Sequence, residues 1–144
     1  MSWFGTEANA VVKLNTLASI CRGDLIVYLT DRTILVPEWR EKLLKAFERI
    51  GNSGVVSFAT NTPSTGAISA DYFKKLGFIH YPGYLHYHGD QELGERARID
   101  NKFVECLDII ESTYPKPEST SKREEIIKHD WTLYHIREDL GFSI

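Results

Sequence analysis

Hydrophobic and polar residues follow two periodicities along the chain, and the segments that show them alternate. Apolar spacing and end signals predict five helices, at Glu7–Arg22, Glu38–Ile50, Ile68–Leu76, Asp90–Ile99 and Arg123–Leu140. Apolar or aromatic runs predict strands at Leu25–Leu29, Gly54–Thr60, Tyr84–His88 and Phe103–Ile110. Polar segments rich in Pro, Ser and Thr predict loops at Asn61–Gly66 and Ser112–Lys122.

Strands that alternate with helices predict the α/β class, here as a three-layer sandwich with a small mixed or mostly parallel sheet. The 144 residues are expected to form a single domain over residues 1–144. Few strands are visible for such a sheet, so we expect it to be incomplete on its N-terminal side.

Composition and charge narrow the classes of partner. The chain is 42% hydrophobic and 26% charged with a net charge of -3, which does not favour binding to nucleic acid. No apolar run reaches the roughly 20 residues of a membrane span. The first ten residues lack a signal pattern, which predicts a cytoplasmic protein. Cys21 and Cys106 match no metal or redox spacing, so both are expected to be reduced, buried thiols.

The apolar run Leu25–Leu29 ends next to an acid, Asp31, and side chains at the carboxyl end of a strand face the ligand crevice of an α/β sheet. One interpretation is a solvated or capping acid in a turn. The other is a ligand for Mg²⁺ or Mn²⁺, cations that prefer carboxylate oxygens. The neighbour Arg32 adds a positive charge instead of a second acid.

A second candidate site lies in the segment HYPGYLHYHGD. If Tyr84–His88 is extended, His86, His88 and Asp90 share one face and could hold a transition metal. The alternative is an aromatic-rich strand whose histidines form hydrogen bonds at the surface.

The segment GDQELGERAR places Asp90 and Glu92 at the start of a helix, where the helix dipole favours negative charge. Glu92 is expected to pair with Arg96 one turn later. A carboxylate in this position could also act as a general base on a hydroxyl group. The closing helix is expected to pack its apolar residues inward, namely Ile126, Ile127, Trp131, Leu133 and Ile136.

The order of these segments resembles the acceptor-side half of an inverting GT-A glycosyltransferase of the family 2 kind. The resemblance rests on a helix with Asn15, then GDLIVYLTD, PEW, GVVSF, KKLGF and GDQELGERAR. It implies that Asp31 occupies the metal-binding DxD-like turn and that Asp90 is the catalytic base. It also implies that Asn15, Asp31 and Arg32 bind the nucleotide-sugar donor, with Mg²⁺ or Mn²⁺ as cofactor. Trp39 and the tyrosines of 81–87 would line the acceptor side.

The sequence departs from that family's pattern in three places. Arg32 and Gly89 stand where the family has acids, and no nucleotide-binding units precede Glu7. The leading hypothesis is therefore transfer of a sugar from a nucleotide sugar to a glycan or other hydroxyl acceptor, with help from a second chain or a second copy. The alternative is a non-catalytic module that binds a glycan or a protein. A third hypothesis is an acetyltransferase-like protein, because DYFKKLGF resembles a helix of that family.

Overall fold

The computed structural model describes residues 10–113 and 124–143. The helices are α1 (Ala10–Ile20), α2 (Trp39–Glu48), α3 (Ala70–Leu76), α4 (Gly89–Ile99), a 3-10 turn at Leu107–Ile109, and α5 (Glu124–Asp139). The strands are β1 (Leu25–Tyr28), β2 (Thr33–Leu35), β3 (Val55–Ser57), β4 (Gly66–Ser69), β5 (Phe103–Glu105) and β6 (Ile110–Thr113). The segments 7–9 of the first predicted helix and 114–122 of the predicted loop lie outside the described residues.

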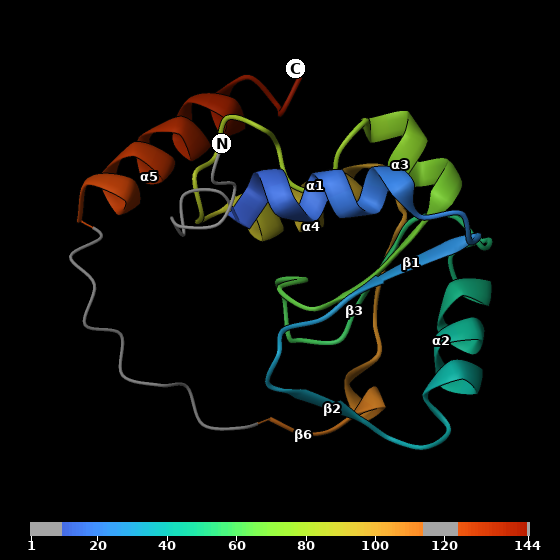
Figure 1. Cartoon of the computed structure of the whole chain (residues 1–144). Helices are drawn as coiled ribbons and strands as arrows, with labels where there is room; N and C mark the ends of the chain where they lie inside the picture. The colour runs from blue at the N-terminus through green and yellow to red at the C-terminus, as the bar shows by residue number, and fades with distance from the viewer. Residues whose placement is uncertain (1–9, 114–123, 144) are drawn as a thin grey trace.

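A four-stranded sheet in the order β1-β4-β3-β5 forms the centre of the molecule. Strand β4 is antiparallel to β1 and β3, whereas β3 and β5 are parallel, so the sheet is mixed. Helix α2 covers one face, and α1, α3 and α4 lie on the other (Figure 1). The antiparallel pair β2–β6 forms a separate small sheet. The predicted α/β class with a small mixed sheet is confirmed.

Alternation along the strands divides the apolar residues between the two faces of the central sheet. On β1, Ile26 and Tyr28 pack with α1, α3 and α4, whereas Leu25 and Val27 pack with α2. Adjacent residues of β3 divide in the same way, with Val55 on the first face and Val56 on the second. The sheet is therefore buried on both faces, which explains why its strands read as continuous apolar runs.

Several predicted bounds are wrong. The helix predicted from Ile68 starts at Ala70, because Gly66–Ser69 is strand β4. Gly66 is the first residue of that strand. A larger residue would not fit there, because a Cβ would meet the Val56 carbonyl oxygen at 2.4 Å. The strand predicted over Phe103–Ile110 divides into β5, a 3-10 turn and the start of β6.

Helix α5 is confirmed over Glu124–Asp139, but of the residues predicted to pack inward only Leu133 is packed against a core cluster. Its buried residues are Asp130, Tyr134 and Arg137, whereas Trp131 and Ile136 are 55% and 53% exposed. The inner face is polar because it binds backbone and side-chain groups of the neighbouring loop and of α4. Cys106 is buried as expected, but Cys21 is exposed, and both are free thiols.

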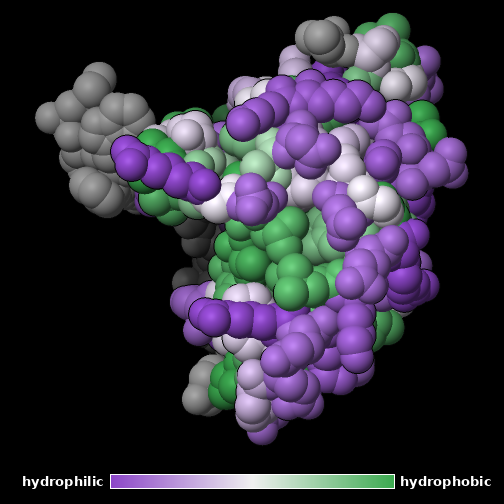
Figure 2. Space-filling model, turned by 90° about the vertical axis from the view of Figure 1, so that its right-hand side faces the viewer, coloured by the Kyte–Doolittle hydropathy of each residue, from purple (hydrophilic) through white to green (hydrophobic). Residues whose placement is uncertain are grey.

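Exposed apolar side chains also gather away from α5. Seen from the side where α1 joins β1, the surface carries an apolar area bordered by hydrophilic residues (Figure 2). Leu17 and Ile20 near the end of α1, and Leu44 on α2, are more than half exposed. Across residues 10–113 and 124–143, no helix combines the length and apolar character needed to cross a membrane.

Candidate functional site

The end of β1, the start of α1, the loop 78–88 and the start of α4 surround one cavity of about 520 Å³. Its polar lining comes from Thr30, Ser64, His80, His86, His88 and Asp90, and from the Tyr28 and Tyr87 rings. Its apolar lining comes from Ala10, Val11, Leu14 and Leu29. The cavity therefore joins the two features that the sequence singled out, the carboxyl end of β1 and the acid at the start of α4.

Strand β1 ends at Tyr28, and the next two residues, Leu29 and Thr30, line the cavity. The Tyr28 hydroxyl donates to the Pro63 carbonyl oxygen at 3.0 Å, and the Thr65 hydroxyl donates to the Tyr28 carbonyl oxygen at 3.2 Å. These bonds fix the strand end against the loop 59–65. Asp31 and Arg32 follow in the turn to β2, with Asp31 exposed and Arg32 half-buried, and neither lines the cavity.

Asn15 on α1 fixes the first part of the loop 78–88. Its side-chain Oδ1 accepts the backbone N–H groups of Ile79 and His80 at 2.9 and 3.1 Å, and its Nδ2 donates to the His80 carbonyl oxygen at 2.7 Å. The amide predicted to bind the donor thus holds a loop backbone. Its effect on the cavity is to position His80.

Asp130 on α5 fixes the second part of the same loop. Its carboxylate accepts the backbone N–H groups of Leu85, His86 and Tyr87 at 2.7 to 2.9 Å. Burial acts to raise the pKa of Asp130, but these N–H groups and the His129 ring together hold it below its ordinary value. The strand predicted at Tyr84–His88 is wrong, because a carboxylate takes the N–H groups that a neighbouring strand would have bound.

The three cavity histidines differ in how their rings are held. The His88 Nδ1 lies 2.9 Å from Gln91 Oε1, and its ring packs on Tyr134. His88 adopts φ 66, which ends the loop and starts α4. The His80 Nε2 and the His86 Nδ1 are buried, and in the described part of the chain neither has a hydrogen-bond partner. Burial lowers the pKa of His80 below the ordinary imidazole value, against the opposite effect of the Asp90 charge.

Gly89 allows His80 to approach the start of α4. A Cβ at Gly89 would lie 2.6 Å from His80 Cγ and 2.9 Å from its Nδ1. The family pattern has an acid in this position, and here the imidazole ring takes up that space.

Asp90 occupies the first turn of α4 and lines the cavity. Its Oδ1 accepts the Gln91 N–H at 2.9 Å. Burial, and secondarily the charge of Asp90, raises the pKa of the Tyr28 hydroxyl above its ordinary range. The Asp90 charge therefore acts on the Tyr28 hydroxyl, as expected for two residues that line one cavity.

Glu92 has a role that the sequence did not reveal. It is 1% exposed, and its strongest partner is Arg137 on α5, at 2.6 and 2.8 Å, with the Tyr84 hydroxyl at 2.7 Å. The predicted partner Arg96 is only at 3.5 Å. No local signal marks Arg137, because 45 residues separate it from Glu92.

Few of the described side chains are placed to bind a metal ion together. Among residues 10–113 and 124–143, no group of three or more His, Cys, Asp or Glu side chains is placed to hold a metal ion. His86 and His88 reach the same cavity, but Asp31 does not line it. The metal-binding roles predicted separately for Asp31 and for His86 and His88 stay predictions.

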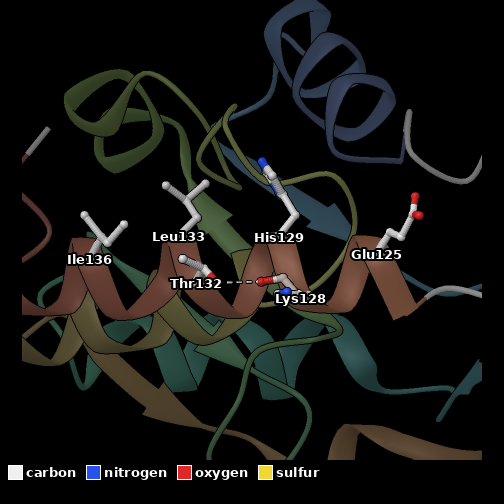
Figure 3. A pocket seen from close by; sticks show the side chains of 6 residues that line it. All are labelled: Glu125, Lys128, His129, Thr132, Leu133 and Ile136. Atoms are coloured by element: carbon white, nitrogen blue, oxygen red, sulfur yellow. Dashed lines mark hydrogen bonds between the residues drawn. The ribbon is translucent and has the colours of Figure 1, made fainter.

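A second hollow of about 480 Å³ lies along α5, where Figure 3 shows its side chains on one side of the helix. It is lined by Glu125, Lys128, His129, Thr132, Leu133 and Ile136. The Thr132 hydroxyl donates to the Lys128 carbonyl oxygen, and the His129 Nδ1 lies 2.7 Å from Asp130 Oδ1. The Thr132 hydroxyl and the His129 ring thus have partners within α5, whereas two histidines of the Asp90 cavity carry ring nitrogens without a partner among the described residues, so the Asp90 cavity is the better candidate site.

Comparisons of the chain with protein-family models, with curated protein sequences and with solved structures found no match.

Proposed function

We propose that the chain is a glycosyltransferase-like protein in which Asp90 activates a hydroxyl acceptor for attack on a nucleotide sugar. The observation that carries the proposal is the single cavity that joins Asp90 to the end of β1. The reaction class comes from the order of the sequence segments, which resembles that of a GT-A enzyme. The cavity is the place where the acceptor would bind beside Asp90.

In the proposed step, Asp90 accepts the proton of an acceptor hydroxyl group. The hydroxyl oxygen forms a bond to the anomeric carbon of the donor, and the bond from that carbon to the diphosphate oxygen breaks. The configuration at the anomeric carbon is inverted. General base catalysis of this kind contributes about 10² to 10⁴ in rate.

The residues present do not form a fitting site for Mg²⁺ or Mn²⁺ at Asp31, because this exposed carboxylate stands beside Arg32 instead of a second acid. Arg32, which directly follows Asp31 in sequence, is the cation proposed to complement the charge of a departing diphosphate.

The chain is also proposed to act with a second chain or a second copy of itself. Of the strands in the described parts of the chain, only β4 pairs with β1, so β1 has one free edge. Its sequence LIVY carries no charge or proline that would discourage pairing. Light scattering of the purified chain tests self-association, which would give a mass above that of one chain.

Transfer assays test the role of Asp90. The wild-type chain, Asp90→Asn and the matched control Asp24→Asn are each incubated with donors and acceptors. The donors are nucleotide sugars of uridine, guanosine, thymidine and cytidine, and the acceptors are a set of saccharides. Asp24 is exposed and precedes the opposite end of β1. Product is expected with the wild type and Asp24→Asn, and about a hundredfold less with Asp90→Asn. Equal rates for the wild type and Asp90→Asn would rule out this base.

The second candidate is a non-catalytic module that binds a glycan or a protein. It is favoured by the position of Asp31, which is exposed and outside the cavity lining. Calorimetry with uridine or guanosine diphosphate and Mn²⁺ separates the two proposals. Nucleotide binding, with or without Mn²⁺, contradicts the module, whereas saccharide binding without nucleotide binding supports it. A cytoplasmic location stays a prediction under either proposal.

A further inference from the structure

The cavity around Asp90 contains two polar atoms whose hydrogen-bonding capacity is unused. His80 Nε2 and His86 Nδ1 are buried and have no hydrogen-bond partner among residues 10–113 and 124–143, although both rings line the cavity. A buried polar group without a hydrogen bond costs about 1 to 3 kcal/mol. Such groups in a folded protein call for a specific explanation, such as an enclosed water or a ligand.

The backbones of His80 and His86 are held in place from outside the cavity, which fixes where the two side chains enter it. The backbone of His80 is bound by the Asn15 amide, and its ring packs against Gly89. The backbone of His86 is bound by the Asp130 carboxylate. Both rings line the cavity, so an occupant of the cavity would lie beside them.

The other lining residues define the chemistry of an occupant. Thr30 and Ser64 supply hydroxyl groups, and Asp90 supplies a carboxylate that accepts hydrogen bonds. Val11, Leu14 and Leu29 form an apolar wall. Among the described residues that line the cavity there is no Lys or Arg, and Asp90 would repel an anion. The lining thus suits an uncharged molecule with one hydroxyl-rich edge and one apolar face.

The geometry points to an uncharged saccharide ring as the occupant, with the imidazoles of His80 and His86 bound to two of its hydroxyl groups. This inference rests on the proposed function for the name of the substrate class and goes further in assigning two recognition residues. It also places the nucleotide diphosphate outside this cavity, because the lining offers it no cation.

Nuclear magnetic resonance of the imidazole nitrogens tests the inference on the full chain. Long-range ¹H–¹⁵N spectra of the ¹⁵N-histidine-labelled protein are recorded during titrations with glucose, galactose, mannose, inorganic phosphate and Zn²⁺. The His80 and His86 signals are expected to shift with at least one saccharide. His129 and His135, about half exposed on α5, serve as internal controls and are expected to stay in place.

Two other outcomes would overturn the inference. Shifts with phosphate or Zn²⁺ and with no saccharide would indicate an anion or metal site. No shift with any of the five probes would indicate that enclosed water satisfies the two nitrogens. A wild-type titration needs no variant to fold, so its result stands by itself.

Variants then measure the contribution of one ring. His86→Ala is expected to weaken saccharide binding about tenfold, the loss of roughly one hydrogen bond. His86→Gln retains a donor and an acceptor and is expected to recover part of the loss, and His135→Ala is the matched control. Unchanged binding in His86→Ala would contradict the assignment. Binding that persists while Asp90→Asn transfers as fast as wild type would refute the proposed function and leave this inference intact.

Discussion

The guanidinium of Arg137 on α5 forms two hydrogen bonds to the carboxylate of Glu92 on α4, at 2.8 and 2.6 Å. Both side chains are buried, at 4% and 1% exposed, and the Arg137 guanidinium also stacks on the Tyr81 ring at 3.3 Å. Glu92 lies two residues after Asp90. The ion pair therefore ties the closing helix to the helix that presents the proposed base.

Removal of one charge from this pair is expected to destabilise the fold strongly. Arg137→Met leaves the Glu92 carboxylate buried without its main cation, which costs about 3 to 5 kcal/mol. The double variant Glu92→Leu with Arg137→Met is expected to lose less than the sum of the two single variants, because no uncompensated charge remains. Urea unfolding of the four proteins measures this coupling, and additive losses would contradict the pair.

Acid is expected to weaken the attachment of the loop 78–88 to α5. The pKa of Asp130 is lower in the folded chain than the value of about 3.9 of an unfolded aspartate. Its ionised form therefore adds stability above about pH 4, and this contribution is lost as the pH falls through the lower folded pKa. Unfolding midpoints measured from neutral to acid pH test this dependence.

Asp130→Asn is the matched variant for that experiment. It is expected to be about 2 to 4 kcal/mol less stable at neutral pH, since an amide replaces a carboxylate that accepts three backbone N–H groups. Its stability should also decline less than that of the wild type when the pH falls. Parallel pH curves for the two proteins would show that Asp130 does not contribute as described.

Gly89→Ala is expected to displace the His80 ring and change the cavity. The new methyl group would lie 2.6 Å from His80 Cγ, closer than packed atoms allow. The cost is about 1 to 3 kcal/mol, with a shift of the His80 imidazole resonances. Gly23→Ala is the control, because its methyl group meets its nearest atom at 3.4 Å. Equal spectra for Gly89→Ala and the wild type would contradict the close packing.

Asn15→Ala is expected to act on the loop and not on a bound nucleotide. The substitution removes three hydrogen bonds to the backbone of Ile79 and His80, which should destabilise the chain by about 1 to 3 kcal/mol. Amide hydrogen exchange at these two residues should accelerate, while exposed Thr16→Ala leaves it unchanged. Unchanged exchange with weakened nucleotide binding would instead support the role in donor binding implied by the sequence.

The layers of the fold were predictable because strands that are buried on both faces have continuous apolar sequences. Leu25–Tyr28 and Val55–Ser57 are strands for that reason, and α2 follows Pro37 as predicted. Strand β4 was missed, since Gly66–Ser69 continues directly into α3 without a turn signal. Local patterns do not separate such a short strand from the first turn of a helix.

The location of the candidate site was predictable, but not all of its residues were. Asp90 and the end of β1 were found from their places at a helix start and a strand end, and both line the cavity, whereas Asp31, the residue predicted to act at that strand end, lies outside the lining. Asp130 and Arg137 were missed because their partners lie about 45 residues away in sequence. The helix that carries them was consequently expected to bury Trp131 and Ile136 instead.

The location of a bound saccharide in a crystal tests the central claim most directly. Crystals of the wild-type chain are soaked with the saccharide that produces the largest histidine shifts. We expect electron density in the cavity between α1, the end of β1 and α4, with a hydroxyl group within hydrogen-bond distance of the Asp90 carboxylate. Density along α5, or elsewhere with an empty Asp90 cavity, would contradict it.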